Sequence, residues 1–357
     1  MTQAIRHVMP ATLSVDESDP RYLIADISPN VPVYLVERAR RLGIDCNPWF
    51  AGLGFRRNQL DDPSLRISYR QARTLVRRAI ASFNEPGLGL ILGSEETVGS
   101  FGLLGLAMMT SRHFGDAMRV GIAHHRLCGS LLDVDFAVVD TSTVAVCAWP
   151  RFGETELLPF LSEELFSSSL SFARELVGPQ LLPKGLELSY AAPPYAHDYA
   201  RVFQCDVRFG CAHNRILVDT RWLDFPLPGY NPLTSRQSLA LCTQQSRGHK
   251  ANDEIVTSVE RLLRSRLDEH PRLTEVAQSL HLSERSLRRR LAESGRIFRE
   301  IHDRVRAERA LELLQGGSLS VAEIGAQIGF SDPREFRRAF KRWTGMSPRE
   351  AGRLRDP

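Results

Sequence analysis

Two stretches toward the end of the chain decide its fold. Residues 273–291 read LTEVAQSLHLSERSLRRRL, and residues 321–340 read VAEIGAQIGFSDPREFRRAF. Each begins with a short apolar stripe at helical spacing, passes through a tight turn, and ends in a second helical segment. The buried pair of that segment is predicted to be two leucines in the first stretch and two phenylalanines in the second. A short support helix, a tight turn and a second helix with an outward basic face are typical of a helix-turn-helix.

The second helix of each stretch is predicted to carry a basic face. At about 100° per residue, Arg285, Arg288 and Arg289 lie about 100° to 200° away from the buried Leu287. The arginine fork matches O6 and N7 of guanine and also binds phosphate, so these side chains suit the major groove of DNA. The sequence leaves open which of them read bases. The DNA-binding candidates are Arg285, Ser286, Arg288, Arg289, Arg334, Arg337, Arg338 and Lys341.

The two predicted helix-turn-helix stretches form an internal duplication. Arg285 recurs as Arg334 after 49 residues, and the second turn is predicted to be one residue longer than the first. Between them, the apolar spacing from Phe298 onward predicts one helix of about 18 residues, nearly 30 Å long, ended by the glycine pair at 316–317. Successive major-groove faces are about 34 Å apart, so we expect a bipartite site of about 20 base pairs for one protomer.

Helix starts in this region carry capping signals. A Ser or Asp followed three residues later by Glu satisfies free backbone donors of the first turn and fixes where the helix begins. Three capping boxes are predicted: Ser320 with Glu323, Asp332 with Glu335, and Ser347 with Glu350.

The composition is ordinary for a globular protein, with the excess charge at one end. The 357 residues include 46 Lys and Arg against 42 Asp and Glu, and the part from residue 250 onward holds 22 basic and 17 acidic residues. A basic module on a near-neutral body favours a polyanionic partner such as nucleic acid. No apolar run reaches the roughly 18 residues of a membrane span, no secretory signal is visible, and the six cysteines never form Cys-x-x-Cys. We therefore expect a cytoplasmic protein with free thiols and no membrane partner.

The region before residue 250 mixes helical and extended patterns. Helical spacing covers residues 69–83, the surroundings of Phe114 and Leu161, and residues 232–245, while residues 136–149 look extended and residues 207–218 look like a hairpin. We expect an α+β sensor domain followed by an all-α DNA-binding domain with two helix-turn-helix motifs joined by a long helix. The predicted parts are a flexible arm at 1–20, a ligand-sensing and dimerisation domain at 21–245, a linker at 246–253 and the double helix-turn-helix domain at 254–357.

The N-terminal region offers few candidates for chemistry. Two histidine–cysteine groups and one aromatic cluster stand out: His124, His125 and Cys128; Cys205, Cys211 and His213; and Tyr195, His197 and Tyr199. Neither cysteine group has the paired short spacing of a zinc site, and we interpret the aromatic cluster as a loop anchor. No nucleophile elbow, phosphate loop or dinucleotide fingerprint is present, so we predict no catalytic residue, no metal and no cofactor.

Residues 254–352 resemble the DNA-binding domain of the AraC/XylS family of bacterial transcription regulators. The resemblance rests on a set of apolar, turn and basic positions: Val276, Ala277, Ser283, Leu287, Arg306, Leu313, Leu314, Ile324, Gly329, Phe330, Ser331, Phe336, Phe340, Lys341, Gly345, Ser347 and Pro348. Ala351 and Gly352 stand where the family often has Tyr-Arg, Gly325 where alanine is usual, and His281 where glycine is common. Gly325 is expected to loosen its support helix, because glycine costs about 1 kcal/mol there relative to alanine.

The N-terminal region is similar to the arabinose-binding-type sensor domain of one subgroup of the same family. The similarity is carried by residues 99–111 and 114–118, and by residues 209–214 and 222–228. It implies a domain that binds a small molecule or a partner, without implying that the ligand is arabinose.

Together these observations predict a sequence-specific DNA-binding transcription regulator. Its partners would be double-stranded DNA, RNA polymerase, an unknown small-molecule effector or adaptor protein, and a second copy in a homodimer, the last by resemblance alone. We expect an activator, although the residues themselves favour neither activation nor repression. Two alternatives remain open: an enzyme or metal sensor in residues 21–245 that uses the C-terminal module for targeting, and a regulator controlled only by an adaptor.

Overall fold

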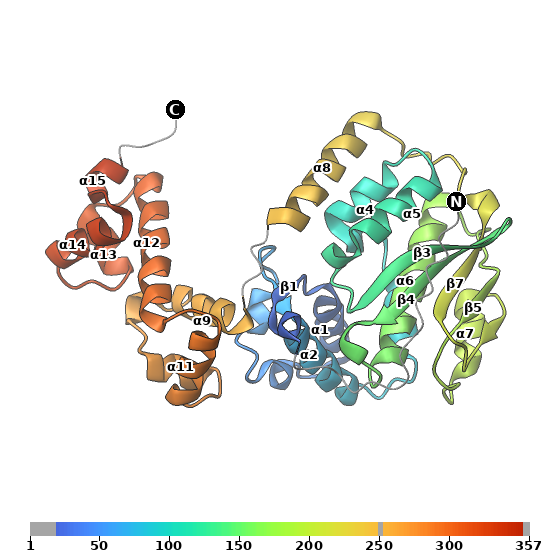
Figure 1. The fold of residues 1–357 in the computed structure, drawn as a ribbon, viewed down its shortest axis with the longest axis horizontal. Helices are drawn as coiled ribbons and strands as arrows, with labels where there is room; N and C mark the ends of the chain where they lie inside the picture. Colours follow the sequence, from blue (N-terminus) through green and yellow to red (C-terminus); the bar gives the residue numbers. More distant parts are fainter. Residues whose placement is uncertain (1–18, 249–252, 353–357) are drawn as a thin grey trace. The chain divides into compact units, whose positions relative to one another are not determined.

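The computed structural model describes residues 19–248 and 253–352, whose elements are labelled in Figure 1. The chain divides into two compact units, residues 1–49 with 60–251 and residues 50–59 with 252–357. The short segment 50–59 was expected in the N-terminal domain. It packs in the second unit because Arg261 donates a hydrogen bond to the carbonyl oxygen of Gly54 at 3.2 Å and its guanidinium lies 5.6 Å from the ring centroid of Phe55.

The first unit is built on a five-stranded sheet in the order β3-β4-β7-β5-β6. Its strands are β3 (Leu132–Asp140), β4 (Thr143–Pro150), β5 (Gly185–Glu187), β6 (Val207–Arg208) and β7 (Asn214–Asp219). The extended segment predicted at 136–149 is confirmed and forms the long β3–β4 hairpin. A separate two-stranded sheet pairs β1 (Ala25–Ile27) with β2 (Ile67–Ser68).

The hairpin predicted over residues 207–218 is wrong. Strand β5 lies between β6 and β7, parallel to β6 and antiparallel to β7. The chain after β6 stays beside the end of β5, because the backbone N–H of Gly210 bonds to the carbonyl oxygen of Tyr190 at 3.0 Å and that of Cys211 to Leu188 at 2.9 Å. The alternation of apolar residues correctly indicated extended backbone here, but it could not show which strand pairs with it.

Eight α-helices of the first unit lie among the described residues. They are α1 (Asn30–Leu42), α2 (Tyr69–Ser82), α3 (Leu88–Glu95), α4 (Gly102–Met109), α5 (Phe114–Ala123), α6 (Leu158–Val177), α7 (Ala196–Phe203) and α8 (Pro232–Gly248). The four helices predicted from spacing are confirmed as α2, α5, α6 and α8. Helix α8 continues to Gly248, so the predicted linker begins inside a helix. Residues 249–252 of that linker, and residues 1–18 of the predicted arm, lie outside the described residues.

The second unit is all-helical where it is described, apart from turns, as predicted. Its α-helices are α9 (Glu254–Arg264), α10 (Leu273–Ser279), α11 (Glu284–Glu293), α12 (Phe298–Gly316), α13 (Val321–Gln327), α14 (Pro333–Thr344) and α15 (Pro348–Ala351). Two apolar cores form in it. Leu287 and Leu291 of α11 pack with Val305 of α12, and Phe336 of α14 packs with Ala310 of α12. The long helix thus contributes to both cores and joins them.

The predicted helix caps are largely confirmed. Ser320 and Ser347 form reciprocal capping boxes with Glu323 and Glu350. The box predicted at Asp332 is wrong in one respect: its side chain accepts a hydrogen bond from the second helical N–H, that of Arg334, at 2.8 Å, and no reciprocal bond from the glutamate is described. Among residues 19–248 and 253–352, no helix is long and apolar enough to cross a bilayer.

Candidate nucleic-acid interface and ligand pocket

The sequence-predicted basic residues lie on α11 and α14, each the second helix of a helix-turn-helix. We call α10–α11 the first motif and α13–α14 the second motif. Figure 1 shows α11 beside one end of α12 and α14 beside the other. All seven predicted basic side chains are exposed, and Ser286 is half-buried, with its hydroxyl oxygen 2.9 Å from that of Ser283. The structure therefore groups the candidates into two exposed basic faces, one for each motif.

The arginines of the first motif are partly paired with acidic neighbours. The guanidinium nitrogen Nη2 of Arg288 lies 2.5 Å from Oε1 of Glu284, and Nη1 of Arg289 lies 3.5 Å from Oε1 of Glu293. Glu284 also accepts a hydrogen bond from the Thr274 hydroxyl at 2.8 Å, which with the nearby Arg288 lowers the pKa of its carboxyl. Ion pairs this exposed are weak and exchange readily, so both arginines remain available to a nucleic acid.

The second motif carries its positive charge without such neighbours. Within the described part of the chain, Arg334, Arg337, Arg338 and Lys341 have no ion pair, whereas Arg342, on another face of α14, lies 3.6 Å from Asp303. The basic face of α14 is therefore the stronger electrostatic attractor of the two for a polyanion.

A junction beside α12 fixes the second turn. The Arg306 guanidinium is buried, lies 5.1 Å from the ring centroid of Phe330 and hydrogen-bonds the ring of His270. Burial and the neighbouring arginine lower the pKa of His270, so the ring is neutral and can accept from the guanidinium. At Gly329, whose φ is 86°, a Cβ would lie 2.5 Å from His270 and 2.7 Å from the carbonyl oxygen of Leu267. Only glycine fits this turn.

Gly325 has a packing role that the sequence did not indicate. A Cβ at this position would lie 3.2 Å from the ring of Phe336, which is fully buried. The corresponding pair in the first motif is Ala277 with Leu287. The glycine that was expected to loosen its helix therefore makes room for a larger core side chain.

A second basic cluster was missed by the sequence analysis. Arg272, Arg296 and Arg299, together with Arg288 of α11, line a hollow of about 590 Å³ that no Asp or Glu side chain lines among the described residues. The three additional arginines lie at helix ends and in the turn before α12. They share no helical face, so periodicity could not group them. Their charge suits an anionic group such as phosphate.

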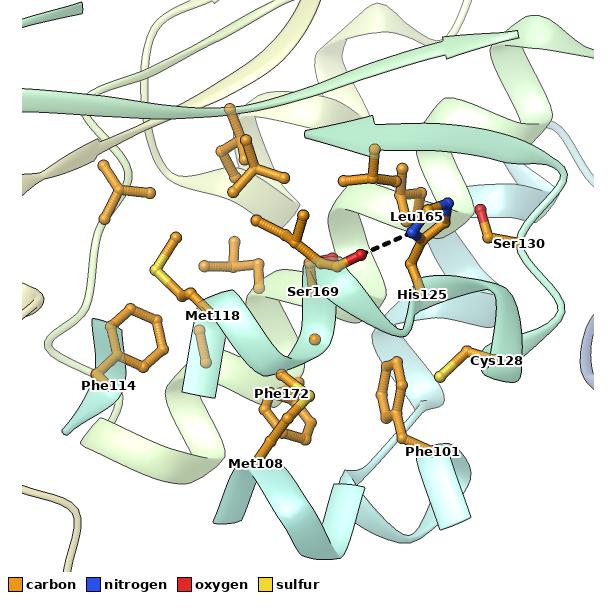
Figure 2. A pocket seen from close by; sticks show the side chains of 18 of the residues that line it. Phe101, Met108, Phe114, Met118, His125, Cys128, Ser130, Leu165, Ser169 and Phe172 are labelled. Carbon is orange, nitrogen blue, oxygen red and sulfur yellow. Dashed lines mark hydrogen bonds between the residues drawn. The ribbon is translucent and has the colours of Figure 1, made fainter. Parts of the chain in front are cut away.

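The first unit encloses an apolar pocket, shown in Figure 2. It has a volume of about 130 Å³ and lies between α4, α5, α6 and strands β3, β4 and β7. Phe101, Phe172 and Met118 contribute to its walls, and no Asp, Glu, Lys or Arg side chain lines it among the described residues. No sequence pattern indicated it, because its lining comes from several helices, strands and loops between residues 101 and 218.

The polar groups of the pocket are few. They are His125, Cys128, Ser130 and Ser169, of which His125 and Ser130 lie on one side in Figure 2. Nδ1 of His125 donates a hydrogen bond to the carbonyl oxygen of Ile122 at 2.7 Å. Nε2 is buried, lies 3.7 Å from Asp133 and has no hydrogen-bond partner among the described residues. Burial raises the pKa of the Cys128 thiol, so it is not an activated nucleophile.

The other candidates of the N-terminal region form no reactive site. The hydroxyls of Tyr195 and Tyr199 both donate hydrogen bonds to the carboxylate of Glu163, at 2.9 and 2.5 Å, which anchors α7 to α6. His197 is exposed beside Asp198. In the described ranges no three His, Cys, Asp or Glu side chains gather as a metal ion requires. Burial raises the pKa of Cys205 to about 11, so its thiol stays protonated at neutral pH.

Both units match known protein families. Residues 43–227 match the model of the arabinose-binding domain of AraC transcription regulator, N-terminal, and residues 276–353 match that of a helix-turn-helix domain. The ornithine utilization regulator of Pseudomonas aeruginosa is 31% identical over 318 residues, which cover 88% of this chain and 92% of that protein. The transcriptional regulator VqsM of the same organism is 26% identical over 276 residues, covering 73% and 82% of the two chains.

One solved structure spans nearly the whole chain. The transcriptional regulator CdpR from Pseudomonas aeruginosa matches with a TM-score of 0.45 and 22% identity, covering 91% of this chain and 98% of that one.

Proposed function

The chain belongs to the AraC family of DNA-binding transcription regulators, with an N-terminal domain of the arabinose-binding type, and we propose that it reads a bipartite DNA site with α11 and α14. Members of this family are transcription regulators rather than enzymes. The observation that carries the proposal is the pair of exposed arginine faces on duplicated motifs joined by α12. The 19 residues of α12 span about 28 Å, close to the about 34 Å between successive major-groove faces.

Within each motif the residues near the helix start are proposed to read bases. Arg285 and Arg334 occupy the same position relative to the buried pair, with Ser286, Arg288, Arg289, Arg337, Arg338 and Lys341 completing the two faces. Residues in the first turns of a recognition helix reach base edges, and the arginine fork suits guanine there.

The second basic cluster is proposed to bind the DNA backbone. Arg272, Arg296 and Arg299 lie beside α11 without belonging to its outward face. Phosphate contacts hold a protein in register on the duplex without reading sequence. They release counterions, so each contact removed should lower the slope of log affinity against log salt by about 1.

Control of DNA binding is proposed to come from a small molecule in the first unit. One relative is named for ornithine utilization. Ornithine carries two ammonium groups and one carboxylate at neutral pH, and no charged side chain lines the described pocket. We therefore do not extend ornithine to this chain. From family membership we further propose a homodimer that acts with RNA polymerase in the cytoplasm, where bacterial DNA lies. Control by an adaptor protein alone is the competing version.

The test is discrimination between specific and random DNA by single variants. Arg285→Ala and Arg334→Ala should each cost about 2 kcal/mol of discrimination, because a bidentate arginine–guanine pair contributes about 1–3 kcal/mol. Arg309→Ala is the matched control, since this exposed arginine on α12 pairs with Glu312 at 2.9 Å and lies on neither basic face. Competition binding against random DNA measures the ratio. Unchanged discrimination in both recognition-helix variants would refute the assignment of α11 and α14.

A further inference from the structure

We propose that the pocket of the first unit takes a compact neutral molecule with an apolar body of six to eight carbon atoms and a single hydroxyl group. This inference rests on the proposed function, in which the first unit holds the effector. It goes further by stating the ligand's size, charge and one polar group. Each of the three follows from a different observation.

The size follows from the volume. The pocket has a volume of about 130 Å³. An engineered cavity of about 150 Å³ in another protein, lined by aliphatic and aromatic side chains, stays dry and binds benzene. A single six-membered ring with one or two substituent atoms therefore fills the space here. A sugar would also meet almost no hydrogen-bonding partners, because the walls are formed by side chains such as Phe101, Met118 and Ile216.

The absence of charge follows from the lining. No Asp, Glu, Lys or Arg side chain lines the pocket in the described part of the chain. An ion placed against such walls would lose its hydration without a counter-charge, which costs several kcal/mol. The nearby carboxylate of Asp133 does not change this, because it is already paired with Arg151 at 2.9 Å and Arg126 at 3.3 Å. Carboxylates, ammonium compounds and zwitterionic amino acids are thereby disfavoured.

The hydroxyl follows from the geometry of His125. Because Nδ1 donates to the carbonyl oxygen of Ile122, Nε2 is the ring nitrogen left to meet a ligand. It is buried, and its 3.7 Å distance from Asp133 is too long for a hydrogen bond. A buried polar nitrogen left without a hydrogen-bond partner costs about 1–3 kcal/mol, and a ligand hydroxyl, which can both donate and accept, would remove that cost. Ser130 lies at the same side of the pocket, but its hydroxyl already donates to the carbonyl oxygen of Leu132 at 3.0 Å and accepts from the Leu132 N–H at 3.2 Å, so Nε2 is the group on this side that lacks a partner.

Three probes with one ring skeleton separate these claims. Isothermal titration calorimetry of the full chain would compare p-cresol, toluene and p-toluate, which carry a hydroxyl, no polar group and a carboxylate on the same methylated ring. We expect p-cresol to bind about three- to ten-fold more tightly than toluene, the effect of one buried hydrogen bond, and p-toluate to give no heat of binding. Tighter binding of p-toluate than of p-cresol would overturn the proposal, as would the absence of binding by both p-cresol and toluene.

Variants locate the binding in this pocket. Ser169→Leu fills the pocket from α6 and should weaken p-cresol and toluene alike by at least about ten-fold. Ser171→Leu is its matched control, because Ser171 is equally half-buried on the same helix but does not line the pocket. His125→Phe keeps an aromatic ring and should bring the ratio of p-cresol to toluene affinity to about one. A purely structural role of His125 would weaken both probes without changing that ratio, and that result would overturn the assignment of the hydroxyl.

These outcomes are independent of the DNA-reading proposal. Calorimetry of the full chain involves no DNA, so failure of every probe would remove the ligand assignment and leave the test of Arg285 and Arg334 untouched. Conversely, loss of the bipartite DNA site would leave the binding of p-cresol to the first unit as a measured property of the chain.

Discussion

The two helix-turn-helix motifs follow one plan but differ in how tightly their turns are held. Each turn places one residue at positive φ, His281 at 55° in the first motif and Gly329 at 86° in the second. His281 carries a full side chain there, whereas a Cβ at Gly329 would meet the ring of His270 and the carbonyl oxygen of Leu267. Both turns therefore keep a residue at positive φ. Only at Gly329, however, do neighbouring atoms leave no room for a side chain.

The motifs also differ in core packing and in charge. In the first motif the corresponding core residues are Ala277 and Leu287, and in the second they are Gly325 and Phe336. The second motif therefore has a smaller residue on the support helix and a larger side chain on the recognition helix. Helix α11 contains four arginines and two glutamates, whereas α14 contains four arginines, one lysine and one glutamate. The second motif is therefore the more strongly basic of the two, and its recognition helix carries the larger core side chain.

The largest expected difference concerns the turns. Gly329→Ala should lower the free energy of unfolding of the second unit by about 3 kcal/mol, from left-handed backbone strain together with overpacking against Leu267. Urea denaturation of the full chain followed by circular dichroism measures it. His281→Gly is the control and should raise stability by about 0.5 kcal/mol, because it relieves left-handed strain at the cost of glycine's greater backbone entropy. Equal effects at the two turns would contradict the comparison.

The next difference concerns DNA affinity. Replacing Arg337 and Arg338 together by alanine should weaken binding to the specific site about ten-fold or more. In the matched double variant of Arg288 and Arg289, the loss of binding free energy should be about half as large. These two arginines must break their ion pairs with Glu284 and Glu293 before they can contact DNA. Fluorescence anisotropy over a series of salt concentrations measures both losses. A larger loss in the first motif would reverse the electrostatic ranking.

The packing difference predicts a coupling between two positions. Gly325→Ala should be destabilising while Phe336 is present and stabilising in the Phe336→Leu background, where the pair becomes that of the first motif. The coupling free energy should be about 1 kcal/mol, within the range for residues in contact. A double-mutant cycle by chemical denaturation measures it. Additive effects would mean that Gly325 leaves no room that Phe336 uses.

The smallest expected effect is on pH dependence. Burial, with the neighbouring Arg306 and His270, lowers the pKa of His302 to about 4, and burial also lowers that of His270. Both rings are neutral in the folded protein, whereas a histidine of the unfolded chain takes up a proton below about pH 6.5. The free energy of unfolding is therefore highest above about pH 6.5 and decreases as the pH falls toward 4. We expect a loss of less than about 1 kcal/mol, because solvent screens these partly exposed rings. Urea midpoints between pH 7 and 5 measure it, and His302→Gln should flatten the profile. An unchanged profile in that variant would show that His302 is not responsible.

Much of this architecture could be predicted from sequence because its signals are local. Helical spacing, caps and the duplicated arginines lie within short windows, and α2, α5, α6 and α10–α14 were found from them. The basic faces followed, since a helix places residues such as Arg285 and Arg288 by arithmetic alone. The family resemblance of both regions is confirmed by the matching models.

The remainder depends on contacts between distant segments. Gly325 looked like a weakness because its partner Phe336 lies on another helix. Strand β5 enters between β6 and β7 from an earlier part of the chain, so alternation near residue 210 could not reveal it. The apolar pocket draws its lining from several helices, strands and loops, and the basic hollow combines helix ends that share no periodicity. Such sites arise from tertiary packing, and no short segment of the sequence contains all of their residues.

The claim that two rigidly joined motifs read one DNA site can be tested directly by changing the spacing of that site. The full chain would first be used to select fragmented genomic DNA at near-physiological salt, and the enriched site would then be lengthened by five base pairs at its centre. We predict two half-sites one helical turn apart, and a fall in affinity to that of a single half-site after the insertion, because α12 cannot follow the second half-site to the opposite face of the duplex. Undiminished affinity for the lengthened site, or a single continuous site indifferent to Arg334→Ala, would contradict the account.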